Sequence, residues 1–190
     1  MKDIVIGVSN RHLHVSQADL EALFGPGYEL TNKKDLKQPG QYACEECVEI
    51  CGPKGCFPKV RILGPVRPVT QVEISLTDSF KLGVKAPVRN SGDLEGTPSL
   101  TLKGPYGSVE LKEGVIVAAR HIHMHTDDAA AYGLKDKDIV SIETVDNGRS
   151  VVFNNVLVRV KDSFAMEMHV DIDEANAAML KNGDVVKLVK

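Results

Sequence analysis

Two pairs of histidines stand out in this sequence because their types and spacing could bind a metal. RHLHVS begins at Arg11 and RHIHMH begins at Arg120, and each follows an aliphatic run. Side chains two residues apart on a strand lie on the same face, so each pair directs two imidazoles to one place. Imidazole nitrogen is a common ligand of zinc and other transition metals. The pairs are His12 with His14, and His121 with His123.

The two segments have similar surroundings, which indicates a duplicated unit. Each has an aliphatic strand, then Arg-His-x-His, then Ser16 or Thr126 in front of a short helical segment. Both hydroxyls are suitable helix N-caps, and acidic residues follow in both first turns. We therefore expect two related half-sites that meet in one cleft. One such pair on a strand could equally be a surface or core feature, but the repetition disfavours that alternative.

Third ligands are predicted on two other strands. In RPVTQVEIS, alternation puts Arg67, Gln71 and Glu73 on one face, and in MEMHVDID it puts His169 on the face opposite Met168. The first face could also be a solvated outer surface. Glu73 could complete one histidine pair and His169 the other, although spacing alone does not fix these groupings. Each set would leave an open coordination position, as a catalytic metal requires.

Composition excludes several classes of protein. The chain has 190 residues and a net charge of −3, with no cluster of lysine or arginine, which argues against a nucleic-acid surface. No apolar stretch of about 18 residues and no charged-then-apolar leader is present, so we expect neither a membrane span nor export. A cytoplasmic location is predicted.

The four cysteines crowd into CEECVEICGPKGC, where a hairpin is predicted to turn at Gly52 to Gly55. A zinc ribbon would need a second, distant Cys-x-x-Cys. We expect reduced, packed thiols, with a structural metal or cluster as the alternative.

Strand signals dominate the chain, with short helices between them. Two similar segments begin at Tyr132 and at Ala178, and each follows a short Ala-rich helix and continues through a Leu-Lys turn into a strand. This repeated unit of helix, turn and strand is typical of small closed barrels. The fold class is therefore predicted as mainly β, with two small closed β-barrel domains capped by short α-helices, one inserted in the other. We expect residues 1–45 and 118–190 to form the first, discontinuous domain and residues 46–117 the inserted one, with the active site between them.

Several long motifs resemble the phosphotransacylases of the propanediol-utilisation (PduL) type, which transfer an acyl group between coenzyme A and inorganic phosphate. The similarity spans nearly the whole chain in order. Its motifs are GVSNRHLHVS, QPGQYA, ILGPVRPVTQVEIS, APVRNSGDLEGTP, GVIVAARHIHMH, FNNVLVRV and MEMHVDIDEANAA.

The resemblance implies two β-barrel domains and two zinc ions. It implies that His12, His14 and Glu73 hold one zinc beside the coenzyme A sulfur. It likewise implies that His121, His123 and His169 hold the second zinc, beside water or phosphate. Arg67 is implied as the catalytic arginine on phosphate. The supporting polar groups implied for substrate are Gln41, Gln71, Ser91 and Arg159.

The expected reaction converts propionyl-CoA or acetyl-CoA plus inorganic phosphate to acyl phosphate plus coenzyme A, reversibly. We expect direct attack of phosphate on the thioester, with metal or arginine stabilising the oxyanion. Two alternatives stay open: a zinc-dependent hydrolase acting on a thioester or related acyl substrate, and a non-enzymatic metal-binding scaffold. A homo-oligomer is compatible with the sequence.

His125 and the four cysteines depart from the family pattern, and the short N-terminal segment is a further feature of this chain. His125 follows the second pair at the next same-face position, where we predict a surface residue at the start of a helix, with a ligand or proton carrier as the alternative. Only six residues precede Gly7, which disfavours association with a bacterial microcompartment shell and favours a free enzyme.

Overall fold

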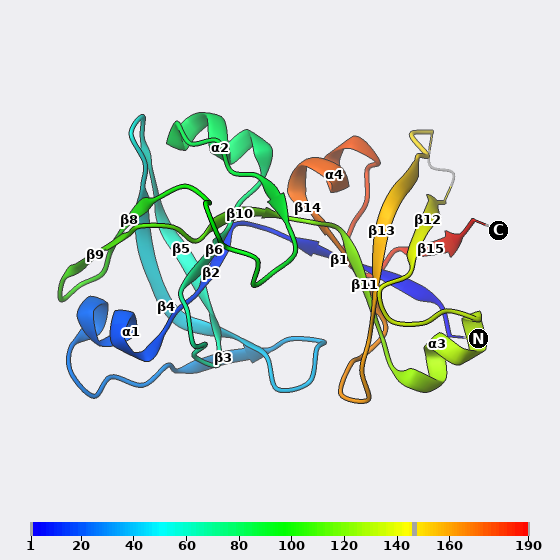
Figure 1. The fold of residues 1–190 in the computed structure, drawn as a ribbon, viewed down its shortest axis with the longest axis horizontal. Helices are drawn as coiled ribbons and strands as arrows, with labels where there is room; N and C mark the ends of the chain where they lie inside the picture. Colours follow the sequence, from blue (N-terminus) through cyan, green and yellow to red (C-terminus); the bar gives the residue numbers. More distant parts are fainter. Residues whose placement is uncertain (1, 146–147, 190) are drawn as a thin grey trace. The chain divides into compact units, whose positions relative to one another are not determined.

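The computed structural model describes residues 2–145 and 148–189. The chain divides into two compact units, which are described separately below. The barrel unit comprises Met1–Ser9, Lys37–Pro39 and Ala119–Lys190, and the sheet unit comprises Asn10–Leu36 and Gly40–Ala118. Both consist mainly of strands with short helices, as predicted (Figure 1).

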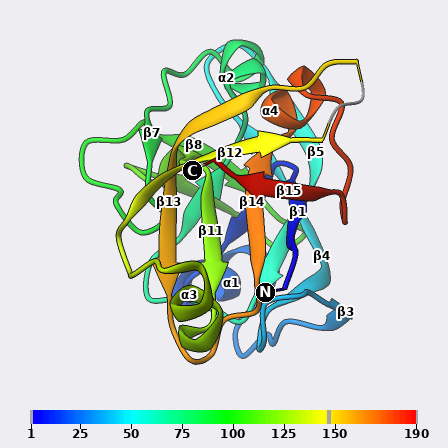
Figure 2. The same ribbon diagram turned by 90° about the vertical axis from the view of Figure 1, so that its right-hand side faces the viewer.

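The barrel unit contains a closed six-stranded barrel in the order β1-β14-β11-β13-β12-β15, whose strands face the viewer in Figure 2. Pairing is parallel between β1 and β14 and between β11 and β13, and antiparallel between β11 and β14. The strands are β1 (Ile4–Ser9), β11 (His121–Met124), β12 (Ile139–Thr144), β13 (Val152–Val160), β14 (Glu167–Asp171) and β15 (Val185–Leu188), with helices α3 (Thr126–Tyr132) and α4 (Ile172–Ala177).

Strand alternation fills the interior of this barrel. Ile122 and Met124 on β11, and Met168 and Val170 on β14, are at most 1% exposed and belong to one core cluster. Burying an aliphatic side chain of this size contributes roughly 1.5–3 kcal/mol. Because alternate residues point to opposite faces, the same alternation turns His121, His123 and His169 away from this core.

The sheet unit contains a nine-stranded sheet, in which β3 pairs with β4 beside the path β7-β10-β6-β2-β5-β4-β8-β9. This sheet curls without closing, so the closed barrel that we expected here is a half-barrel. Its strands are β2 (His12–His14), β3 (Asn32–Asp35), β4 (Tyr42–Cys51), β5 (Cys56–Gly64), β6 (Gln71–Glu73), β7 (Val88–Arg89), β8 (Leu100–Lys103), β9 (Ser108–Leu111) and β10 (Val115–Ala118), with helices α1 (Gln17–Phe24) and α2 (Leu76–Leu82).

The two compact units differ from the expected domains at the N-terminal side. Residues 10–36 and 40–45 belong to the sheet unit, whereas we placed residues 1–45 in the first domain. The reason is β2, which pairs with β5 and β6 while Leu13 and Val15 join the core of the sheet unit. The extent of the domains themselves stays a prediction.

The observed helix N-caps agree only in part with the N-caps predicted from the sequence. Ser16 caps α1 by accepting a hydrogen bond from the Asp19 backbone N–H, as predicted. The prediction of Thr126 as a cap was wrong, because the preceding His125 caps α3 through Nδ1, which accepts from the Asp127 N–H. His125 is therefore a residue at the start of a helix.

The cysteine cluster also required a correction. Strands β4 and β5 form the predicted hairpin, and their register sets Cys51 opposite Cys56 at a Cα–Cα separation of 4.1 Å. These two form a disulfide, so the expectation of reduced thiols was wrong for them. Cys44 and Cys47 are free thiols, and burial raises the pKa of Cys44 to about 11.

Among the described residues, none of the helices has the length and apolarity needed to cross a membrane.

Candidate metal centres

The first centre joins two neighbouring strands of the sheet unit. Strands β2 and β6 are antiparallel, and their register sets His12 opposite Glu73 and His14 opposite Gln71. One ligand atom from each of His12, His14 and Glu73 lies within 4.8 Å of the other two. We call these three residues the HHE set.

Hydrogen bonds fix the orientation of both imidazoles in the HHE set. The Nδ1 of His12 lies 2.9 Å from the Asn10 carbonyl oxygen, and the Nδ1 of His14 lies 2.9 Å from the Leu63 carbonyl oxygen. A carbonyl only accepts, so each Nδ1 carries the proton and each Nε2 keeps its lone pair for a ligand. The Nε2 of His12 lies 3.4 Å from a carboxylate oxygen of Glu73.

Burial keeps His14 neutral. The residue is 2% exposed, and burial, helped by the charges of His12 and Arg67, lowers its pKa to about 3. A metal binds the unprotonated imidazole, so a ring that is neutral throughout the physiological range is ready to bind without losing a proton.

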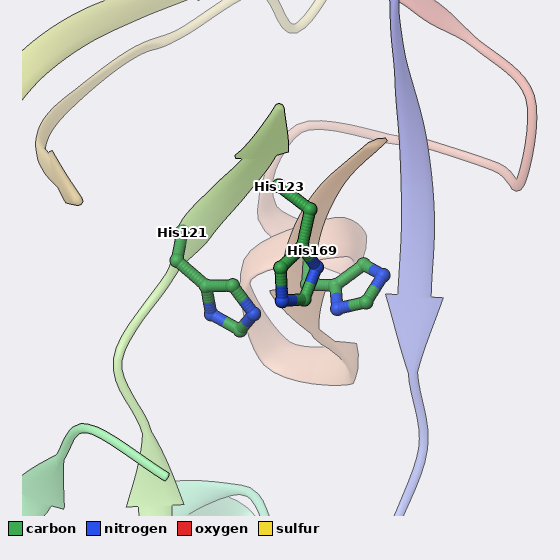
Figure 3. Close-up of side chains that lie close together, drawn as sticks. All are labelled: His121, His123 and His169. Carbon is green, nitrogen blue, oxygen red and sulfur yellow. The ribbon is translucent and has the colours of Figure 1, made fainter. Parts of the chain in front are cut away.

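The second centre lies in the barrel unit and consists of His121, His123 and His169, which we call the HHH set. The three imidazoles lie close together in Figure 3, two from β11 and one from β14. Strand register sets His121 opposite His169, and the three ligand atoms lie within 4.8 Å of one another. Ring centroids are 4.7–5.1 Å apart.

The HHH set leaves a buried polar atom without a partner. The Nδ1 of His123 is buried and has no hydrogen-bond partner within the described part of the chain. Burial, followed by the charges of His121, His169 and Arg159, lowers the pKa of His123 to about 2. An unpaired buried nitrogen costs about 1–3 kcal/mol, which a bound metal would offset. Three imidazoles whose ligand atoms lie within 4.8 Å of one another, one of them with such an atom, fit a metal ion.

The arginines of the repeated motif serve the structure of each unit. Arg11 donates from Nε and Nη2 to the Asp78 carboxylate at 2.9 and 2.7 Å, and Arg120 lies 3.0 Å from Glu174. Asp78 and Glu174 each occupy the third position of a helix and complete a capping box there. The surroundings of the two sets are thus alike beyond their histidines.

Polar groups predicted to bind substrate gather beside the HHE set. Gln71 donates through Nε2 to Glu73 and to the Ser91 hydroxyl, the latter at 2.8 Å, and the Ser91 hydroxyl lies 3.1 Å from Glu73. Arg67 Nη1 lies 3.4 Å from the same hydroxyl. Arg67 precedes β6 and is anchored by its N–H to the Val15 carbonyl, so our prediction of one long strand from Arg67 was wrong.

Two predicted substrate groups lie elsewhere. Gln41 precedes β4, and among the described residues its side chain makes no hydrogen bond to the HHE set. Arg159 lies on β13 beside His123 in the parallel register of the barrel unit. The structure therefore brings Arg67, Gln71 and Ser91 together with the HHE set and places Arg159 next to the HHH set.

Sequence reasoning gave no role to two residues beside the HHH set, although alternation puts Glu167 on the same strand face as His169. Glu167 lies 2.8 Å from His169, and Gln38 donates to Glu167 at 3.2 Å. Glu167 could have been found, since it precedes His169 by two residues on the same strand face. Gln38 has no such signal, because the contact joins segments 129 residues apart.

Known proteins resemble this chain along nearly its full length. A family model described as phosphate propanoyltransferase matches residues 5–181. Phosphate propanoyltransferase of Thermotoga maritima is 60% identical over 98% of this chain and 89% of its own length. The proteins of the same name from Rhodopseudomonas palustris and Clostridioides difficile are 54% and 52% identical, over 98% of this chain and 82% and 89% of their own lengths. The chain therefore belongs to the phosphate propanoyltransferase family and is a phosphate acyltransferase.

Proposed function

We propose that this enzyme transfers a short acyl group, propionyl or acetyl, between coenzyme A and inorganic phosphate with the help of two zinc ions. Family membership supports the acyl transfer, with an acyl-CoA and phosphate as the substrates. The observation that carries the metal part is the presence of two sets of three residues, whose ligand atoms lie within 4.8 Å of one another in each set. Three protein ligands leave a coordination position open for substrate, which is the mark of catalytic zinc rather than structural zinc.

The HHE set would hold one ion, beside the coenzyme A sulfur, and the HHH set the other, beside phosphate. Bound zinc would act as a Lewis acid that stabilises a thiolate and the charge of phosphate. The protein prepares both sets before an ion arrives, since backbone carbonyls orient His12, His14 and His121 through Nδ1. That both sets serve one catalytic centre stays a prediction.

Arg67 would bind and orient phosphate. A guanidinium presents paired N–H donors that match two phosphate oxygens, and it keeps its charge at any physiological pH. Its neighbour Ser91 is held by Gln71, so the hydroxyl has a fixed place beside the guanidinium. Gln71 and Ser91 would add polar contacts to substrate, and Gln41 would do the same. Arg159 would supply a second cation beside the HHH set.

In the proposed reaction, a phosphate oxygen attacks the thioester carbonyl carbon. The new C–O bond forms a tetrahedral intermediate whose oxyanion Arg67 stabilises, and the C–S bond then breaks with its electron pair moving to sulfur. Acyl phosphate and coenzyme A thiolate are the products. The enzyme contributes binding, orientation and charge, and no side chain is acylated.

The test is phosphate-dependent release of coenzyme A thiol from propionyl-CoA and acetyl-CoA, before and after chelation, with metal content measured on the same sample. Release that needs phosphate, stops on chelation and returns with zinc would support the proposal and rank the two substrates. Release without phosphate would instead identify a hydrolase. Ping-pong kinetics or an acylated protein would contradict direct attack.

A non-enzymatic scaffold is disfavoured by family membership. Association of copies into a homo-oligomer and a cytoplasmic location stay predictions.

A further inference from the structure

The residue two positions before the third ligand contacts that ligand in both half-sites. On β6, Gln71 donates to Glu73, and on β14, Glu167 lies 2.8 Å from His169 Nε2. The strand registers are equivalent, since His14 is opposite Gln71 and His123 is opposite Glu167. The chemistry is reversed to suit the ligand: a carboxylate ligand is paired with an amide donor, and an imidazole ligand is paired with a carboxylate acceptor.

Gln38 shows that Glu167 acts as an acceptor. Gln38 is 3% exposed, and both ends of its amide contact Ala165: Nε2 donates to the carbonyl at 2.9 Å, and Oε1 accepts from the N–H at 3.3 Å. This pairing fixes which end of the amide is Nε2, the atom that also donates to Glu167 Oε2 at 3.2 Å. The oxygen of Glu167 that contacts His169 therefore already receives one hydrogen bond.

The contact between Glu167 and His169 assigns the proton of the imidazole. The Oε2 atom that accepts from Gln38 lies 2.8 Å from His169 Nε2, and a carboxylate oxygen accepts hydrogen bonds. The proton in this contact then belongs to His169 Nε2, which leaves Nδ1 as the nitrogen with a lone pair.

Gly7 provides the space that this contact needs. It lies opposite His169 in the β1–β14 register, and a Cβ there would lie 2.8 Å from Glu167 Oε1 and 3.0 Å from His169 Cδ2. Both distances are shorter than ordinary van der Waals contact. A side chain at this position would therefore displace the carboxylate, the imidazole or both.

We propose that Glu167 is a positioning residue that fixes His169 as the Nε2–H tautomer, so that Nδ1 faces the metal of the HHH set, with Gln38 and Gly7 holding Glu167 in place. In contrast, His12, His14 and His121 pair Nδ1 with backbone carbonyls and keep Nε2 for the metal. The inference rests on the proposed function, because it concerns the second metal ion of that site. Carboxylate partners of ligating histidines typically raise metal affinity about 10- to 100-fold.

The decisive variant is Glu167→Gln, which keeps the size of the side chain and introduces an N–H donor. Its amide could donate to His169 Nε2 and so favour the opposite tautomer. The full-length chain with His12→Asn and His14→Asn would serve as background, so that the HHH set alone is titrated with zinc against a chromophoric chelator. The matched control is Glu143→Gln, an exposed glutamate of β12 in the same barrel unit.

We expect Glu167→Gln to weaken zinc binding about 10- to 100-fold and Glu143→Gln to leave it unchanged. Gly7→Ala should also weaken binding although it retains the carboxylate. Long-range ¹H–¹⁵N spectra of the metal-free protein should show His169 protonated at Nε2, and the variant Glu167→Gln should shift it toward Nδ1–H. This second measurement needs no metal and would not respond to a merely structural role.

Each unfavourable result has a distinct meaning. If zinc binds with equal affinity to the background and to Glu167→Gln, or if His169 is protonated at Nδ1 in the wild type, the role of Glu167 is refuted while the metal centre stands. If the background binds no zinc at the HHH set, the second metal of the proposed function fails, and the role of Glu167 fails with it.

Discussion

The burial of His14 and His123 should make the metal-free protein lose stability in mild acid. Both rings are at most 5% exposed, and burial lowers the pKa of His14 to about 3 and that of His123 to about 2. A histidine in the unfolded chain titrates near 6.5. Between these values, the unfolded chain binds protons that the folded chain does not bind.

Proton linkage gives the sign and the size of the change in the free energy of unfolding with pH. The folded pKa lies below the unfolded one, so the stabilisation is fully present above pH 6.5 and declines as the pH falls toward the folded pKa. Protonation of one histidine with a pKa of 6.5 stabilises the unfolded chain by about 2 kcal/mol at pH 5 and by about 0.2 kcal/mol at pH 7. Each buried histidine should therefore lower the free energy of unfolding by about 2 kcal/mol between pH 7 and 5. This is a large share of the roughly 5–15 kcal/mol typical of a domain.

The assay is urea unfolding followed by far-UV circular dichroism, in chelator, at pH 8, 7, 6 and 5. Wild type is compared with His14→Gln and His123→Gln, because glutamine is neutral throughout this range and still carries an N–H donor. Between pH 7 and 5, the free energy of unfolding of each variant should fall by about 2 kcal/mol less than that of the wild type. From pH 8 to 7 the free energies of unfolding of wild type and variants should change by the same amount, which provides an internal control for effects other than protonation. A variant that declines as steeply as the wild type would refute the claim that this histidine is held neutral.

Three further outcomes follow from the site and the hairpin. Arg67→Ala should raise the phosphate concentration needed for turnover, or abolish turnover, with metal content near that of the wild type; unchanged activity would remove Arg67 from the site. His121→Ala should lower metal content by about one ion per chain together with activity, measured by elemental analysis on the assayed sample, and an unchanged metal content would exclude it as a ligand. Thiol titration of the denatured protein should find two thiols before reduction and four afterwards, since Cys51 and Cys56 form a disulfide. Four thiols without a reductant would contradict that disulfide.

Local periodicity explains what the sequence could predict about the site. His12 and His14, like His121 and His123, lie two residues apart on short strands, so their shared face follows from strand geometry alone. The third member of each set depends on which strand pairs alongside. The resemblance suggested Glu73 and His169, and the registers of β2 with β6 and of β11 with β14 bring them to the histidine pairs.

Long-range contacts explain what the sequence could not predict. Alternation suggested one strand from Arg67 to Ser75, but pairing limits β6 to three residues and Arg67 is held by the Val15 carbonyl. The Cys51–Cys56 disulfide depends on the register of a hairpin, and composition carries no information about register. Gln38 reaches Glu167 only because residues 37–39 join the barrel unit although the segments on either side belong to the sheet unit.

The difference between the third ligands gives a physical reason for assigning different substrates to the two sets. Glu73 adds a negative charge to the HHE set, so zinc there would keep a formal charge of 1+, whereas the neutral imidazoles of the HHH set would leave 2+. Phosphate carries more negative charge than a thiolate, and the attraction grows with the product of the charges. Each set also has one arginine nearby, Arg67 beside the HHE set and Arg159 beside the HHH set, so the arginines leave this difference in charge unchanged. The two sets are otherwise alike, from the histidine pairs to the arginine on each helix cap. The presence of His169 where the other set has Glu73 is therefore the difference that would make the HHH set prefer phosphate.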